Sequence, residues 1–437
     1  MISPVTTRSR NSISSRRSSN TENDAEERSS DNIPKVRSRL DLFVDLIWVG
    51  IIANLSGNFE TQAYEENGTG VGTALAVFIL LFIPIWRVWD NLRLYTSSFF
   101  IDDIVQRNFT LWILVLAVLY GINAPYAYEP NGGKTSLTLL IILYIISKAS
   151  FVGAYGLQTI FLPFLRKQFW FQVGTSLVII GIWVGAIFVP YPHKIILLVF
   201  ANAVEHPVQV FLASPTSDRL LAENMKKSPD IDHYVDRHEG FFIIILGEGV
   251  FRLIEGSPSG MGLNSQTGTV LTALLIYYIL HWLYFNGDQS KEYVHALRRT
   301  WWKPVLWQMF HVTMFGALLG LDASIIFLVK NLRSDLTATI QEREVNPANP
   351  DVADLARLIH RALWGASGSL GLTIFSMTSI ALLNRSLDVM IICLPLIPGM
   401  TGATWCAAAV ALLYGVFLWE WFGGLERDWK VFEPKSE

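Results

Sequence analysis

The stretch HYVDRHEGFFIIILGEGVF, residues 233–251, begins with charged residues and then places Glu248 inside a run of large apolar side chains. In a helix, Arg237 and Glu248 would share one face and lie about 16 Å apart along the axis. That separation is too large for them to pair with each other, and a charge buried in apolar surroundings needs a partner. The stretch therefore predicts a buried helix whose charged groups find their partners on other helices.

The rest of the chain shares this apolar character. Of its 437 residues, 51% are hydrophobic and only 16% are charged, and the mean hydropathy is +0.36. Apolar runs of roughly 17 to 25 residues, each long enough to cross a bilayer as a helix, recur between residues 42 and 422. The composition predicts an all-α integral membrane protein whose surroundings are the lipid bilayer. The formal net charge of -3 gives no reason to expect nucleic acid as a partner.

We expect about twelve transmembrane helices in a domain that spans residues 39–422. They are expected near residues 42–58, 72–96, 108–127, 136–163, 171–189, 194–213, 238–255, 268–287, 302–330, 358–384, 387–398 and 402–422. Pro395 and Pro398 divide the last apolar stretch, so eleven crossings stay open. Residues 1–38, rich in Ser and Arg, are expected to form a disordered tail, and residues 423–437 a short C-terminal one.

The distribution of Lys and Arg predicts the orientation of the helices. Basic residues lie in the N-terminal tail and in every second connection, for example Arg93 and Arg107, whereas the first connection, residues 58–70, has acids and no base. By the positive-inside rule, both termini are then cytoplasmic and the first connection is extracytoplasmic. Asn67 in that connection begins the sequon NGT and is a candidate for glycosylation. The ninth connection, which follows Lys330, is also basic and departs from the trend.

A short internal similarity favours an even number of helices. RLDLFVDLIWVG at residues 39–50 can be laid over RHEGFFIIILGEG at residues 237–249, which places Arg39 on Arg237. A duplication would give two parallel six-helix repeats. Because the matched stretch is short, chance explains it as well as duplication does. The repeats would cover residues 39–213 and 237–422.

Several polar side chains fall inside the expected helices and are candidates for a pathway that carries a solute or a proton. Ionisable groups are costly within a bilayer and often mark such pathways, although a buried group satisfied by a neighbouring helix is the simpler interpretation. For Glu248, desolvation favours the protonated form, which suits a proton carrier. The main candidates are Asp41, Asp45, Arg237, His238, Glu248 and His311, and the secondary ones are Lys148, Glu205, His281 and Asp322.

Two motifs resemble those of the low temperature requirement A (LtrA) family of multi-pass membrane proteins. DLFVDLIWV at residues 41–49 is similar to the family's ELFFDLVFV, and DRHEGFFIIILGE at residues 236–248 is similar to ERHGLFVIIALGE. Asp41 replaces the family's Glu, and Glu239 is an additional residue in the second motif. The resemblance covers about residues 39–422. It implies a multi-pass fold and a link to growth in the cold, but it names no substrate.

We compare three functions for this sequence. A secondary or proton-coupled transporter of an unknown solute fits the buried acids and the internal similarity. A sensor or scaffold that uses the tail is the alternative. A membrane enzyme fits less well, because the eight histidines form no HExxH motif and GxSxG is absent, so we assign no catalytic residue. The two cysteines, Cys393 and Cys406, predict neither a metal site nor a disulfide framework, and no cofactor is expected. The solute, the oligomeric state and the membrane stay open.

Overall fold

A computed structural model describes residues 39–99, 103–128, 133–161, 166–190, 193–221, 231–255, 260–286, 296–298, 300–331, 350–384, 408–411 and 414–415. Within these ranges every regular element is a helix. The long helices are the N-terminal helix Arg39–Tyr64, α2 Val71–Phe99, α3 Ile104–Asn123, α4 Gly133–Phe161, α5 Arg166–Phe188, α6 His193–Ala213, α8 Ile231–Ile254, α9 Ser265–Asn286, α10 Trp302–Asn331 and α12 Pro350–Asn384. The seven-residue helix α7, Pro215–Leu221, follows α6.

The first ten expected helices are confirmed as elements, and most of their ends agree within a few residues. The largest differences are the starts of α8 and α12, which begin at Ile231 and Pro350 rather than at residues 238 and 358. Polar residues open both helices, so an estimate based on apolar runs places their starts too late. The two expected helices after residue 384 lie outside the described residues, apart from helical residues at 408–411 and 414–415.

Nine of the helices in the described ranges are long and apolar enough to cross a membrane. They are the N-terminal helix, α2, α3, α4, α5, α6, α9, α10 and α12. Helix α8 is not one of the nine because charged residues interrupt its apolar run, yet it packs within the bundle against α9 and α10. The described part of the chain is therefore all helical, and the protein is a multi-pass membrane protein.

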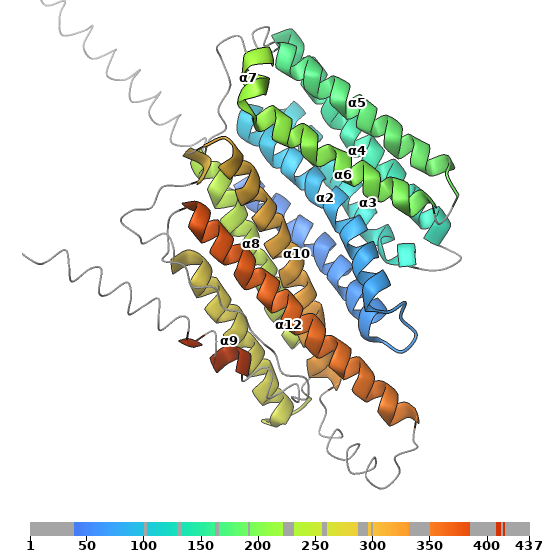
Figure 1. Cartoon of the computed structure of the whole chain (residues 1–437), viewed down its shortest axis with the longest axis vertical. Helices are drawn as coiled ribbons and strands as arrows, with labels where there is room; N and C mark the ends of the chain where they lie inside the picture. Colours follow the sequence, from blue (N-terminus) through green and yellow to red (C-terminus); the bar gives the residue numbers. More distant parts are fainter. Residues whose placement is uncertain are drawn as a thin grey trace, which may run out of the picture.

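The helices form two groups with nearly parallel axes (Figure 1). Helices α2 to α6 make up the first group, in which α4 packs on α3 and α5, and α2 on α3, α4 and α6. The second group holds α8, α9, α10 and α12, with its closest contact between α10 and α12. Contacts of α10 with α2 and α6 join the two groups.

The N-terminal helix also lies between the two groups. Toward the first group, Trp48 Nε1 donates a hydrogen bond to the carbonyl of Ile85 in α2 at 3.3 Å. Toward the second group, the hydroxyl groups of Tyr64 and of Ser324 in α10 lie 2.8 Å apart. Hydrogen bonds to both groups fix this helix in the centre of the bundle.

Helix α10 forms the centre of the second group. Every residue from Ala317 to Val329 is buried, and the helix is apolar on all sides, as expected for a helix surrounded by others. By contrast, large apolar side chains such as Ile196 and Phe188 are exposed on the outside of the bundle, where lipid would cover them. Burial thus distinguishes the core helix from those that face lipid.

Small residues allow α10, α12 and the N-terminal helix to approach one another. A Cβ atom added to Gly365 in α12 would lie 2.0 Å from the hydroxyl of Tyr64, and one added to Gly320 in α10 would lie 2.9 Å from Oγ of Ser369. Membrane helices gain little from burying apolar surface against each other, so close packing at small residues contributes much of their association.

We predict that Gly365→Ala lowers the thermal stability of the purified protein, because the new methyl group collides with the Tyr64 hydroxyl. Overpacking of this kind costs about 1–3 kcal/mol. Gly368→Ala is the matched control, because nothing lies within 4 Å of a Cβ atom at that position of the same helix. Tyr64→Phe should recover part of the loss. Equal melting temperatures for the two alanine variants would contradict this close approach.

Candidate functional site

Arg237 finds its partners on the N-terminal helix. Its guanidinium forms ion pairs with Asp41 and Asp45, and Nη2 donates to Oδ1 of Asp45 at 2.6 Å. The same oxygen accepts a hydrogen bond from Nε1 of Trp89 at 2.7 Å, and Nε2 of His233 lies 3.4 Å from Asp41. We call Asp41, Asp45 and Arg237 the first rung. The expected interhelical partner of Arg237 is thus present.

A second ionic contact joins the same two helices closer to their C-terminal ends. Arg252 donates to Oγ of Ser56 at 3.1 Å and pairs with Glu60, to which Lys330 of α10 donates at 2.9 Å. Ser56 in turn donates to the carbonyl of Leu319 at 2.8 Å. We call Ser56, Glu60 and Arg252 the second rung. Lys330, which departs from the basic-residue trend, is thus the ion-pair partner of a buried acid.

The two rungs have the same spacing on both helices. Arg252 follows Arg237 by fifteen residues, and Glu60 follows Asp45 by fifteen. This number of residues extends about 22 Å along a helix. Because the spacing is equal on the two helices, the N-terminal helix and α8 run parallel and in register over most of their length.

The C-terminal half of α2 carries a further buried network. Arg93 pairs with Asp90 and lies over the ring of Tyr234, with 3.6 Å between Cζ and the ring centroid. Gln308 of α10 donates to the other oxygen of Asp90 at 2.6 Å. Counting Arg93 among the connections was wrong, because it lies within the expected helix 72–96 and within α2, and only 1% of it is exposed. A guanidinium with these partners can stay within the bundle.

His238 and His311 lie together, with 5.1 Å between their ring centroids. Nδ1 of His238 donates to the carbonyl of Tyr234 at 3.0 Å, and Nδ1 of His311 donates to that of Trp307 at 2.8 Å. Nε2 of His311 is 2.9 Å from the hydroxyl of Tyr284, which can donate to it. Both rings are fully buried among aromatic side chains, so packing and hydrogen bonds define their positions.

The secondary candidates Lys148 and Glu205 meet in the first group of helices. Glu205 of α6 pairs with Arg87 of α2, and Lys148 of α4 lies 3.3 Å from Oε1 of the same carboxylate. The hydroxyl of Tyr144 donates to this oxygen at 2.9 Å, and Arg87 also donates to the carbonyl of Asn202 at 2.9 Å. We call Arg87, Tyr144, Lys148 and Glu205 the Glu205 cluster. It ties together three helices of the first group.

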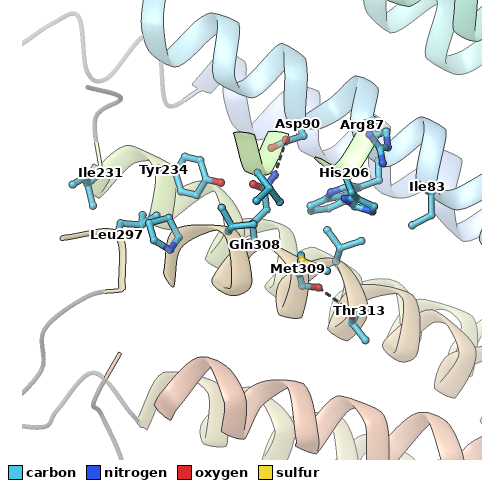
Figure 2. A pocket seen from close by; sticks show the side chains of 15 residues that line it. Ile83, Arg87, Asp90, His206, Ile231, Tyr234, Leu297, Gln308, Met309 and Thr313 are labelled. Atoms are coloured by element: carbon cyan, nitrogen blue, oxygen red, sulfur yellow. Dashed lines mark hydrogen bonds between the residues drawn. The ribbon is translucent and has the colours of Figure 1, made fainter. Parts of the chain in front are cut away.

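A cavity of about 420 Å³ lies where the two groups of helices meet. Helices α2, α6, α8 and α10 line it, together with Leu297. Figure 2 shows Arg87 and His206 at one end, Tyr234 at the other, and the hydrogen bond between Asp90 and Gln308 in the middle. Most of the other lining residues are apolar, and Trp86 is among them. Such a volume, with a few polar groups, is typical of a small-molecule site.

The remaining candidates occupy different positions. Asp322 is buried beside Tyr277, where a Cβ atom on Gly249 would lie 2.7 Å from Oδ1 of the aspartate. Glu248 is half-buried on α8, one turn before Arg252. His281 is exposed and contacts the ring of Phe285. Asn67 lies in the exposed turn between the N-terminal helix and α2. The structure does not bring Glu248 to Asp45, because Asp45 belongs to the first rung and Glu248 lies one turn before Arg252 of the second.

Several residues of the cavity and its networks were missed by the sequence reasoning. Arg87, Asp90 and Arg93 recur at every third position in α2, a spacing that places charges on neighbouring positions of a helix surface. Trp86 and Trp89 lie near the end of an apolar run, where aromatic residues are usually interfacial anchors, but both are buried in the core. Charges that recur on one side of an apolar helix were the feature of the sequence that could have identified these residues.

No three His, Cys, Asp or Glu side chains in the described part of the chain gather closely enough to hold a metal ion. A scan of protein families matches residues 36–420 to the family described as Bacterial low temperature requirement A protein (LtrA). Searches of curated proteins and of solved structures found no match. The family match thus covers both rungs, the Glu205 cluster and the cavity.

We predict that Arg237→Gln destabilises the protein by about 3–5 kcal/mol, because two buried carboxylates lose their counter-charge. The measurement is thermal or chemical unfolding of the purified protein in detergent. Replacing Asp41 and Asp45 by asparagine in the same variant should restore part of the stability, since no uncompensated charge then remains.

Arg107→Gln provides the control, because Arg107 lies on the exposed surface of α3. It should change stability by less than about 0.5 kcal/mol. If Arg237→Gln were as stable as this control, the first rung would not hold the two helices together.

Proposed function

The chain belongs to the low temperature requirement A family, and we propose that it is a secondary transporter that couples the movement of a small solute to protons. The observation that carries this proposal is the cavity between α2 and α6 of one group and α8 and α10 of the other. Secondary transporters place their substrate sites between two bundles, where relative movement can open the site to either side. The position of the cavity supports that arrangement.

The acids within the helices differ in whether they form an ion pair, and this difference bears on proton coupling. Asp41, Asp45, Glu60, Asp90 and Glu205 each form an ion pair with Arg or Lys. Neither Asp322 nor Glu248 has an ion-pair partner among the described residues. An acid that no ion pair holds in its charged form can accept and release a proton as its surroundings change. We assign proton carriage to Asp322 and Glu248.

The remaining main candidates then receive other roles. Asp41, Asp45 and Arg237 hold the N-terminal helix against α8, and we propose a positioning role for them. His238 and His311 lie next to this contact, and Tyr234, which accepts from His238, also lines the cavity. We propose that the two histidines orient α8 and α10 at the cavity wall.

The orientation and repeat predictions remain part of the proposal. The N-terminal helix would be the first crossing and α8 the seventh, with α2 to α6 as the five crossings between them. Two equivalent helices six crossings apart are parallel, which agrees with two six-helix repeats. Under that arrangement both termini are cytoplasmic and the two proposed repeats are parallel. The two rungs support this arrangement, because they show that the N-terminal helix and α8 run parallel.

We predict that Asp322→Asn and Glu248→Gln insert and fold normally but reduce proton movement at least tenfold. Each substitution keeps the shape of the neutral acid and removes titration, so a pathway that needs the proton is interrupted. The measurement is the fluorescence of a pH-sensitive dye inside reconstituted vesicles, with an imposed pH gradient and a panel of small solutes outside.

Glu255→Gln is the matched control, because Glu255 is an exposed acid just after α8. It should leave proton movement unchanged. If the natural chain moved no protons with any solute of the panel, transport would be refuted and a sensor or scaffold favoured. If both amide variants kept full activity, proton carriage by these two acids would be refuted.

We also predict that a cysteine at Glu65 is labelled by an impermeant reagent in intact cells. Glu65 lies in the exposed turn after the N-terminal helix, which the positive-inside rule places outside the cell. A cysteine at Ile104, the first residue of α3, lies at the opposite end of the bundle and should react only after permeabilisation.

Both variants are made with Cys393 and Cys406 replaced by serine, so that the introduced thiol is the only one in the chain. The reverse labelling pattern would invert the topology and place both termini outside.

A further inference from the structure

We propose that the cavity binds a monoanionic carboxylate that carries an apolar body, with Arg87 and His206 at the binding site for the carboxylate. This proposal adds a substrate class to the proposed function. As a statement about binding, it does not depend on transport taking place.

The first argument is the charge balance at the cavity wall. Arg87 and Lys148 share one acid, Glu205, as their ion-pair partner. One helical turn further along α2, Asp90 pairs with Arg93, so those two charges balance each other. The Glu205 cluster therefore holds two cations and one anion, and a bound monoanion would remove the excess positive charge. A buried excess charge is costly, which favours a ligand of opposite sign.

The second argument is the free hydrogen-bonding capacity of Arg87. Its Nη1 atom donates to Glu205 and its Nη2 atom to the carbonyl of Asn202. Its Nε atom is buried and has no hydrogen-bond partner among the described residues. Only 4% of this residue is exposed, yet it lines the cavity. A carboxylate is a strong acceptor for a guanidinium N–H group.

His206 provides a second donor next to Arg87. It lies on α6 directly after Glu205, and Figure 2 shows its ring beside Arg87 at the same end of the cavity. Its side chain is not buried in the bundle and lines the cavity, where it can meet a ligand. Arg87 and His206 thus lie together at one end of the cavity.

The other polar groups of the cavity give no site for a cationic ligand. Asp90 is the acid that lines it, but Arg93 occupies one of its oxygens and Gln308 the other. The rest of the wall is mainly apolar, with Ile83, Val210 and Met309 among its residues. An apolar group attached to the carboxylate would replace water along this surface. The lining therefore fits an amphipathic anion better than a cation or a neutral polar solute.

The test is binding of radiolabelled phenylacetate to the full-length chain in nanodiscs. Unlabelled phenylacetate and octanoate should compete, whereas phenylacetamide and phenethylamine, which present a neutral group and a cation in the same place, should not. Phenyl phosphate, which carries up to two charges, should compete less well than phenylacetate. Arg87→Gln should weaken binding about tenfold or more, because a charge-assisted hydrogen bond is lost.

Two further variants separate binding from folding. Arg107→Gln, on the exposed surface of α3, should bind phenylacetate as the natural chain does. Met309→Trp should fill the cavity and abolish binding without altering any charge, which keeps the test valid if Arg87→Gln does not fold. The melting temperature of each variant shows whether it is folded.

Three outcomes would overturn the proposal: no saturable binding of phenylacetate and octanoate, equal competition by phenethylamine, or unchanged binding in folded Met309→Trp or Arg87→Gln. Tighter binding of phenyl phosphate would also overturn the assignment of a monoanion. Binding without solute-linked proton movement would support the carboxylate site and refute transport. Proton movement with another solute, without phenylacetate binding, would refute only the carboxylate site.

Discussion

Ion pairing between the N-terminal helix and α8 is the constraint on which the rest of the bundle depends. A charge inside a bilayer is costly unless a partner of opposite sign lies beside it. The first rung meets this requirement for two acids at once, and the second rung does so for Glu60. Such pairs add little net stability compared with apolar contacts, but each wrong pairing leaves an uncompensated charge. They therefore determine which helices meet and in which register.

The contact between these two helices also positions the cavity. Tyr234 lies one turn before His238 on α8, and its ring stacks with Arg93 of α2. Arg93 in turn holds Asp90, which accepts from Gln308 of α10. Because Trp89 donates to Asp45 and lies against Arg93, a continuous series of contacts runs from the first rung to the cavity wall. The polar residues of the wall are held by partners on other helices, and the wall does not rely on one helix alone.

Much of the helical architecture could be predicted from the sequence, because a bilayer requires its spanning segments to be apolar and hydrogen-bonded internally. The starts of α8 and α12 could not, since their first turns are polar. The need of Arg237 for a partner on another helix was predictable from its distance to Glu248. The identity of that partner was not, because one sequence contains no information on which helices are neighbours. Arg93 was counted with a connection because of its charge, although it lies within α2, where Asp90 and Tyr234 are its partners.

The equal fifteen-residue spacing of the rungs limits how these two helices can move. A single ionic contact would act as a pivot about which one helix could tilt or slide past the other. Two contacts about 22 Å apart prevent both the tilting and the sliding, because sliding one helix along the other would break both contacts at once. The N-terminal helix and α8 therefore move together as one rigid unit. A change in the width of the cavity must come from α2, α6 or α10, the other long helices that line it.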